Sequence, residues 1–334
     1  MSGVEILTVD AGDDGLRLDR WFKRHCPDLS HGHLQKLLRT GQVRLDGRRV
    51  KASDRLATGQ EIRIPPLPVA DVATTAGTAH ARRAGERARH AAIAEDLADR
   101  VLFKNDAVLV IDKPAGLAVQ GGSKTDRHVD GALDGLRLGA PERPRLVHRL
   151  DKDTSGVLVL ARSVGAARWL TTEFRRRATH KLYWALVAGV PAVEQGRIDM
   201  ALDKLPGGRG EKMAASDDGK PARTFYRVVD RAGRKAAWLA MEPLTGRTHQ
   251  LRVHAAIGLE TPIVGDGKYG PGAAIPDGWP EPRRLQLHAR AIQFAMPSGP
   301  PILVQAPLPG HMKANFDFLG FDPADPEAGF LEVE

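Results

Sequence analysis

The sequence lacks the features typical of secreted and membrane proteins: paired cysteines, a long apolar run and a signal peptide. Cys26 is the single cysteine among 334 residues, which rules out a disulfide framework and a cysteine-based zinc site. No apolar run is long enough to span a bilayer, and acidic residues stand early in the N-terminus where a signal peptide has its apolar core. We therefore expect a soluble cytoplasmic protein without a membrane partner. Its apolar content of 42% suffices for at least one large core.

Familiar signatures of cofactor and metal chemistry are missing as well. The pair Gly121–Gly122 is not followed by G-x-x-x-x-G-K-[ST] or G-x-G-x-x-G, so a bound nucleotide has no support there. His249 and His254 are five residues apart, which puts them on different faces of a helix and excludes the H-E-x-x-H zinc pattern. The serine-hydrolase pattern G-x-S-x-G is absent. We expect neither a cofactor nor a metal.

Positive charge, in contrast, is concentrated in one short segment. The formal net charge is +8, and residues 17–64 hold 12 Lys and Arg against 5 Asp and Glu, a net charge of +7. Such a concentrated basic surface is typical of proteins that bind a polyanion, most often a nucleic acid.

The basic segment has the pattern of a compact module. Apolar residues recur at helical spacing from Leu16 until Pro27, and a second helix is predicted from the cap Ser30 to Gly41. Short strands are predicted at residues 43–45 and 61–64.

Residues 17–64 resemble the S4-type RNA-binding domain. The resemblance lies in R-L-D-x-W at the start, S-x-x-x-x-x-x-L-L-x-x-G-x-V over the second helix and the turn after it, and a closing D-x-L-x-x-G-x-x-I. It implies that the second helix and the following loop contact the phosphates of structured RNA through Lys36, Arg39 and Arg44. An ordinary basic helical subdomain is the alternative.

A proline-rich break separates this module from the rest. We predict an S4-like domain at residues 1–68, a flexible Ala/Arg-rich linker at 69–100 and a main domain at 101–325. Strand patterns outnumber helical ones in the main domain, which predicts an α+β fold around a mixed, largely antiparallel sheet. Strands are expected at residues 108–111, 157–161, 181–187, 223–229, 237–242, 285–296 and 302–306, and helices after Ser163 and Thr248.

One loop of the main domain stands out chemically. Residues 148–156 read H-R-L-D-K-D-T-S-G and run directly into the apolar strand 157–161. Asp151 is the reactive candidate, because Arg149 and Lys152 flank its carboxylate and favour the ionised form. On the residues alone, a polar turn with a surface ion pair is the simpler alternative.

A phenol and two arginines, Tyr183, Arg247 and Arg252, complete the candidate set. Together with Asp151 they suit a buried carboxylate that acts as nucleophile or base. A hydrolase with a carboxylate nucleophile would need an acid partner, which nothing in the sequence supplies.

Residues 101–310 resemble the RluA family of pseudouridine synthases. Four motifs carry the resemblance in the family's order: K-P-x-G-L-x-V at residues 113–119, H-R-L-D-x-x-T-S-G at 148–156, K-x-Y-x-A-x-V at 181–187 and T-G-R-T-H-Q-L-R-V-H at 245–254. The resemblance implies isomerisation of uridine to pseudouridine in RNA, a reaction with no net change of atoms and no cofactor.

Site roles follow from the same resemblance. It implies that Asp151 is the essential carboxylate, that Tyr183 stacks on the flipped base, and that Arg252 pairs with Asp151. Arg149 is implied to fill the space that the base leaves, with His148 and Arg247 also at the RNA. Whether Asp151 attacks the sugar, attacks the base or removes a ribose proton stays open.

The phrase V-Q-G-G-S at residues 119–123 resembles the RluC type, which modifies several uridines of 23S rRNA, and lacks the His-Pro phrase of the RluD type. We therefore expect a monomer that acts on ribosomal RNA. The alternatives are an RluD-like or other structured-RNA target, and a catalytically silent ribosome assembly factor. A silent factor would be expected to have lost the Asp, Tyr or Arg, all of which are present.

Overall fold

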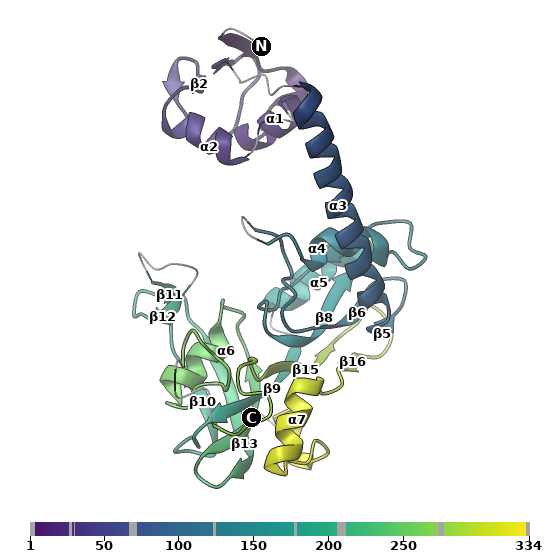
Figure 1. The fold of residues 1–334 in the computed structure, drawn as a ribbon, viewed down its shortest axis with the longest axis vertical. Helices are drawn as coiled ribbons and strands as arrows, with labels where there is room; N and C mark the ends of the chain where they lie inside the picture. The colour runs from purple at the N-terminus through teal and green to yellow at the C-terminus, as the bar shows by residue number, and fades with distance from the viewer. Residues whose placement is uncertain are drawn as a thin grey trace. The chain divides into compact units, whose positions relative to one another are not determined.

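The computed structural model describes residues 4–26, 29, 31–66, 72–122, 125–176, 179–205, 212–270, 272 and 277–331. The chain divides into two compact units, Met1–Arg83 and Ala84–Glu334, which are described separately (Figure 1). Ser30, the predicted cap, and Ser123 lie outside the described residues. Within the described ranges, no helix has the length and apolar character needed to cross a membrane.

Unit 1 is a four-stranded sheet, in the order β1-β4-β2-β3, with two helices packed on it. Trp21 and Phe22 of the first helix and Leu37 of the second are buried in one apolar cluster with Ile62 of β4. Both predicted helices are present. The elements are β1 Glu5–Thr8, η1 Ala11–Asp13, α1 Leu18–His25, α2 His31–Arg39, β2 Arg44–Leu45, β3 Arg48–Arg49 and β4 Glu61–Ile64.

A single long helix, α3 (Val72–Ala98), covers most of the segment that was predicted to be a flexible Ala/Arg-rich linker at residues 69–100. The sequence shows only a weakly helical stretch around residues 91–97, but the whole segment is rich in residues of high helix propensity, although it lacks an apolar stripe along its length. Ile93, Ala94 and Leu97 near its end are buried against strands of unit 2. The last turns of α3 are therefore part of the core of unit 2.

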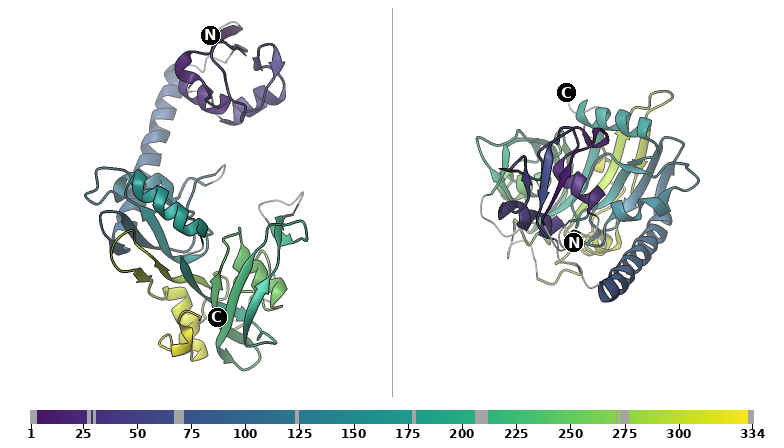
Figure 2. Two further views of the ribbon diagram at one scale, coloured as in Figure 1. Left: turned by 180° about the vertical axis from the view of Figure 1, so that it is seen from behind. Right: turned by 90° about the horizontal axis from the view of Figure 1, so that it is seen from above.

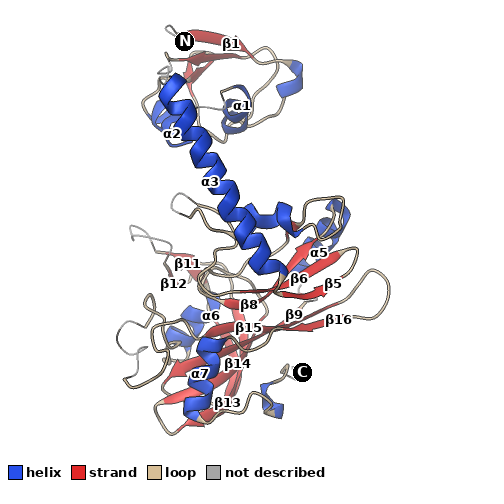
Figure 3. Ribbon diagram, turned by 45° about the vertical axis from the view of Figure 1, so that its right-hand side comes forward, coloured by secondary structure: helices blue, strands red, loops and turns tan. Residues whose placement is uncertain are grey.

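Unit 2 is built on a ten-stranded sheet (Figure 3). Strands β8 and β15 run parallel, and the other strand pairs among the described residues are antiparallel, so the predicted α+β fold with a mixed, largely antiparallel sheet is confirmed. The path is β10-β13-β14-β9-β15-β8-β6-β5, with β16 on β15 and β7 on β8. Its strands are β5 Val101–Lys104, β6 Val108–Lys113, β7 Arg145–Leu146, β8 Ser155–Ala161, β9 His180–Ala188, β10 Gln195–Asp199, β13 Arg223–Ala232, β14 Ala236–Pro243, β15 Leu287–Phe294 and β16 Ile302–Gln305.

Helices cover both faces of this sheet, because its central strands are apolar on both sides. On β8, Leu158 packs with the end of α3 and with α4, whereas Val159 packs with α5. Helix α7 lies against β9 and β14 through Met312 and Phe316 (Figure 2). The remaining elements are α4 Val129–Ala132, η2 Leu133–Leu136, α5 Val164–Arg176, the short pair β11 Leu202–Lys204 and β12 Met213–Ala215, α6 Gln250–Val253, η3 His254–Gly258, α7 Gly310–Leu319 and η4 Pro326–Ala328.

Candidate active site

The loop that carries Asp151 is fixed by the strand that follows it. Strand β8 is buried along its whole length, and Gly156 has a φ of +105°, in the region that favours glycine. A Cβ at Gly156 would lie 2.2 Å from the carbonyl oxygen of Ala289 on β15, so only glycine permits the parallel pairing at this point. The backbone N–H of Thr154 donates to the Asp151 carbonyl at 3.2 Å and closes the turn.

A buried lysine supports the same loop from beneath. The side chain of Lys113, at the end of β6, is fully buried, and its Nζ donates to the carbonyl oxygens of Pro114, Leu117 and Lys152 at 2.9, 2.8 and 3.1 Å. Burial lowers the pKa of Lys113 to about 7, against the opposing effect of nearby carboxylates that include Asp151. The lysine thus ties the 113–119 motif to the residue next to Asp151.

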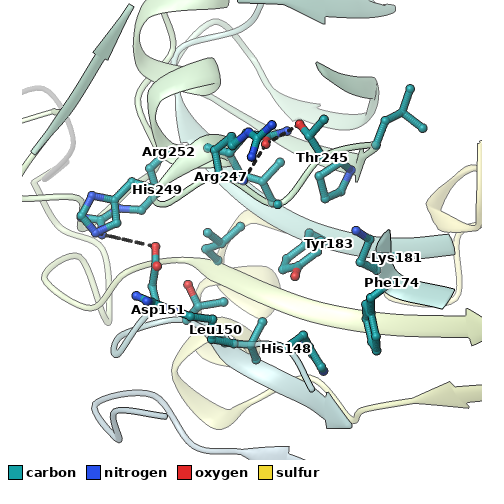
Figure 4. Close-up of a pocket in the computed structure, with 18 of the residues that line it drawn as sticks. His148, Leu150, Asp151, Phe174, Lys181, Tyr183, Thr245, Arg247, His249 and Arg252 are labelled. Carbon is teal, nitrogen blue, oxygen red and sulfur yellow. Dashed lines mark hydrogen bonds and ion pairs between the residues drawn. The ribbon is translucent and has the colours of Figure 1, made fainter. Parts of the chain in front are cut away.

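Asp151 and Tyr183 enter one cavity of about 500 Å³ (Figure 4). Asp151 comes from the loop before β8, Tyr183 from β9, and Arg252 from the short helix α6. Three motifs that are far apart in the sequence therefore meet at one pocket. Its walls also contain His148, Arg149, Leu150, Thr171, Phe174, Arg175, Lys181, Thr245, Arg247, His249 and Leu287.

Arg252 holds two carboxylates at once. Its Nη1 lies 3.7 Å from Oδ2 of Asp151, so the predicted pair is formed at ion-pair distance. The other edge of the guanidinium donates to Asp266, with Nε–Oδ2 at 2.8 Å and Nη2–Oδ1 at 2.7 Å. Asp266 is 1% exposed and also accepts the backbone N–H groups of Lys268 and Tyr269. This bidentate contact fixes the plane of the guanidinium and aims Nη1 at Asp151.

The charge of Asp151 is set by opposing effects. Burial raises the pKa of Asp151 above the ordinary carboxyl value, and Arg252 is the strongest of the cations that lower it, followed by Arg149, Lys113 and Lys268. The carboxylate is therefore poorly hydrated and surrounded by fixed positive charge. Such a group is a stronger base or nucleophile than an exposed aspartate.

Tyr183 presents a ring and a neutral phenol to the cavity. It is held in the middle of the sheet, where it pairs with Met241 of β14 and Ala289 of β15. Burial raises the pKa of Tyr183 far above its usual value, and the charge of Asp151 adds to that effect. The hydroxyl therefore stays protonated, while the ring offers a flat apolar surface to a base.

His249 was considered in the sequence only as a metal ligand, yet it faces Asp151. Its Nε2 lies 3.9 Å from Asp151 Oδ2, and its Nδ1 is 2.7 Å from the Tyr269 hydroxyl. His249 has a left-handed φ of +54° and precedes α6 without a side-chain cap, so the predicted cap at Thr248 is not the start of this helix. Among the described residues, no group of three or more His, Cys, Asp or Glu side chains could hold a metal.

The predicted RNA-contacting residues of unit 2 differ in their surroundings. Arg149 and Arg247 are exposed on the pocket wall, and Arg247 Nε donates to the Pro221 carbonyl at 3.2 Å. His148 instead accepts the backbone N–H of Val159 at 2.8 Å and stacks on Phe174 at 4.6 Å. Burial lowers the pKa of His148 to about 3, so this ring is neutral and supports β8.

Comparison with known proteins is decisive for the family. Residues 107–256 match the family model described as RNA pseudouridylate synthase. Ribosomal large subunit pseudouridine synthase C of Escherichia coli (strain K12) is 34% identical over 317 residues, which cover 93% of this chain and 95% of that protein. Ribosomal large subunit pseudouridine synthase D of Xanthomonas campestris pv. campestris is 36% identical over 338 residues, which cover 97% and 95%.

The chain belongs to the RluA family of RNA pseudouridine synthases.

A solved structure agrees with this assignment. The structure titled Human RNA Pseudouridylate Synthase Domain Containing 4 is 28% identical and covers 69% of this chain and 97% of its own, with a TM-score of 0.59. Asp266 of this pseudouridine synthase was not among the site residues predicted from the sequence. The signal in the sequence is weak: an acidic residue stands two positions after the apolar pair Ile263–Val264, where a buried charge would need a partner.

Proposed function

We propose that this enzyme isomerises specific uridines of ribosomal RNA to pseudouridine, most like the RluC type at several positions of the large-subunit 23S rRNA. The observation that carries the proposal is the placement of Asp151 beside Arg252 in a cavity that also holds Tyr183. Relatives of both the C and D types are named for the large ribosomal subunit, which supports the substrate class.

The reaction needs what this cavity offers. Within structured RNA the reacting C1′ and C5 atoms of a uridine are shielded, so the nucleotide must flip out, at a cost of about a few kcal/mol. In this proposal the flipped uracil stacks on Tyr183 and the Arg149 guanidinium takes its place in the RNA. Asp151 then assists cleavage of the N1–C1′ glycosidic bond, the uracil turns, and C5 bonds to C1′. C5 loses its proton and N1 gains one, so the product is an isomer of uridine.

Unit 1 supplies RNA affinity in the same proposal. Lys36, Arg39 and Arg44 are exposed at the end of α2 and the start of β2. Their charges suit the phosphates of a folded rRNA segment, as the S4-like pattern implies. We also propose that the enzyme works as a cytoplasmic monomer, since every group invoked in the reaction comes from one chain.

A catalytic role for Asp151 is tested with Asp151→Asn on 23S rRNA from cells that lack the enzyme. The purified wild-type enzyme is expected to form pseudouridine at a defined set of positions. The variant is expected to lose at least about 1,000-fold in single-turnover rate, in line with loss of a chemical group, while its RNA dissociation constant stays unchanged. Residual pseudouridine formation at the wild-type rate would contradict the role of Asp151.

The matched control is Asp317→Asn, the same chemical change on the exposed face of α7, which is expected to keep full activity. The silent-assembly-factor alternative would be supported if wild-type enzyme formed no pseudouridine in any rRNA while still binding it. Mapping the modified positions in cells with and without the protein would decide between C-like and D-like targets.

A further inference from the structure

A second cavity of about 820 Å³ borders the active site. It shares Arg252 with the first cavity, so this residue forms a common wall between the two. The other walls come from the turn after β6, from the loop after Asp266 and from the segment before β15. A ligand in the second cavity would therefore be adjacent to whatever group occupies the first.

Cations dominate the walls of this second cavity. Lys268, Arg283 and Arg284 line it together with Arg252, whereas Asp153 is the one acidic residue among the described wall residues. Arg283 and Arg284 are exposed. Arg284 Nε lies 3.7 Å from Glu281 in a partly exposed ion pair, which offsets one of these positive charges and leaves the net charge of the wall positive. A polyanion next to these side chains would gain favourable electrostatic energy.

Three glycines line the cavity and have different roles. Gly116 has a φ of +84° and open space where a Cβ would stand, whereas a Cβ at Gly265 (φ +77°) would lie 2.1 Å from the Arg284 carbonyl oxygen, so Gly265 lets two backbone segments of the wall pack closely. Gly267 is exposed, with open space where a Cβ would stand. The described lining includes no aromatic ring, so nothing there would stack on a nucleobase.

We propose that the second cavity binds a phosphodiester group of the RNA strand, adjacent to the flipped uridine. The proposal rests on the proposed function, because it takes the nucleotide in the first cavity to be part of an RNA chain. A nucleotide held against Tyr183 and Asp151 has a phosphate on each side of its ribose, and the shared Arg252 wall places cations next to that ribose. A charged, aromatic-free cavity suits a phosphate and not a second flipped base.

The test neutralises two cations that have no part in the chemistry. Arg283→Gln/Arg284→Gln is expected to raise the RNA dissociation constant about tenfold and to lower the slope of log K against log salt by about 1. The rate at saturating RNA is expected to stay within about twofold of wild type. The probe is a stem-loop of rRNA that contains a mapped target uridine.

The matched control removes two cations elsewhere in unit 2. Arg234→Gln/Lys235→Gln changes exposed residues in the β13–β14 turn, at the end of β14 opposite to Met241, which pairs with Tyr183. This variant is expected to leave both the dissociation constant and the salt slope unchanged. Equal losses in both double variants would overturn the proposal in favour of general charge attraction.

Replacing one phosphodiester of the RNA by an uncharged linkage shows which phosphate the second cavity binds. A methylphosphonate on one side of the target uridine is expected to weaken wild-type binding about tenfold, and to have little further effect on Arg283→Gln/Arg284→Gln. If a methylphosphonate on either side of the target uridine weakened binding by the same factor in wild type and in Arg283→Gln/Arg284→Gln, the proposal would be overturned. Inorganic phosphate at millimolar concentration is expected not to compete with the stem-loop; efficient competition would indicate a site for small free phosphates instead.

Failure of this inference can be told apart from failure of the proposed function. If wild-type enzyme forms no pseudouridine in rRNA, the proposed function fails. If wild-type enzyme converts the stem-loop and the Arg283→Gln/Arg284→Gln variant binds it with unchanged affinity and salt slope, only the phosphate site fails.

Discussion

Asp151, the proposed catalytic residue, is expected to lower the stability of its own fold. Its carboxylate is largely removed from water, and even with Arg252 as neighbour the pKa of Asp151 in the folded protein lies above that of an exposed carboxyl. The folded state therefore binds a proton at this site more tightly than the unfolded state does. The ionised form consequently lowers stability at neutral pH.

Asp151→Asn is expected to unfold at a higher temperature than wild type at pH 7. The difference in stability between variant and wild type should be largest above the raised pKa of Asp151, where the wild-type carboxyl is ionised. It should vanish below the ordinary carboxyl value of 3.8, because both proteins are then neutral at this position. Thermal unfolding at several pH values checks the prediction. If Asp151→Asn is less stable than wild type at pH 7, the Asp151–Arg252 ion pair stabilises the fold by more than burial of the Asp151 carboxylate destabilises it.

Replacement of Asp266 tests whether this residue positions the Arg252 guanidinium, which keeps its charge in the variant. Asp266→Asn removes the bidentate partner of Arg252 and is expected to lower the single-turnover rate at least about tenfold without changing RNA affinity. Because the pair is buried, the free energy of unfolding is expected to fall by about 3–5 kcal/mol. Denaturant unfolding and rapid-quench kinetics measure the two effects.

An exposed pair of the same type provides the control. Arg223 Nε lies 2.9 Å from Asp199, and both side chains are more than two-fifths exposed. Asp199→Asn is expected to cost less than about 1 kcal/mol and to leave the rate unchanged. If Asp266→Asn behaved like Asp199→Asn, Arg252 would not depend on Asp266 for its position.

At the scale of elements, strand β8 and its Gly156 determine the position of the loop that carries Asp151. Gly156→Ala is expected to lower the free energy of unfolding by at least about 2 kcal/mol, because its φ of +105° and the nearby Ala289 carbonyl leave no room for a methyl group. Activity should fall with stability, since the loop at residues 148–155 would have to move. Thermal unfolding and turnover measurements check this.

Gly165→Ala, in the first turn of α5, is the matched substitution at an exposed helical position, where a Cβ would make only an ordinary van der Waals contact with Ser163 Oγ at 3.9 Å. It is expected to be neutral or to stabilise by up to about 1 kcal/mol. Equal stability of the Gly156→Ala and wild-type proteins would mean that β8 and β15 can separate locally without cost.

Elements with strong local patterns were predictable from the sequence, and elements made by distant contacts were not. Strands such as Ser155–Ala161 and Ala236–Pro243 are short, apolar and bounded by turns, so their pattern alone identified them. Helix α3 was missed because only its last turns carry buried apolar residues. Helix α7, with Met312 and Phe316 facing the sheet, has too few apolar positions to be recognised before its partner strands are known.

The candidate site was predictable only where its residues stand in recognisable motifs. Asp151, Tyr183 and Arg252 stand in motifs that mark them directly, and the structure brings these three into one cavity. Asp266 and His249 were not predicted as site residues, because their contacts with Arg252 and Asp151 form only once the chain is folded.

At the scale of the whole molecule, the end of α3 determines where the chain can be cut. A protein that begins at residue 84 keeps Ile93, Ala94 and Leu97 in the core of unit 2, whereas one that begins at residue 101 loses all three. The first is expected to fold with a cooperative thermal transition. The second is expected to be less stable by several kcal/mol, since each buried aliphatic side chain contributes about 1–3 kcal/mol.

The shorter deletion also tests the role of the basic segment. Removal of residues 1–83 takes away the 12 Lys and Arg of residues 17–64. The salt slope of binding to a 23S rRNA fragment is expected to fall by at least about 2, and affinity at physiological salt by about 100-fold or more, because fewer phosphates are neutralised. The single-turnover rate at saturating RNA should be retained, since Asp151, Tyr183 and Arg252 are all in unit 2. An unchanged salt slope would mean that unit 2 alone supplies the electrostatic attraction and that unit 1 serves another purpose.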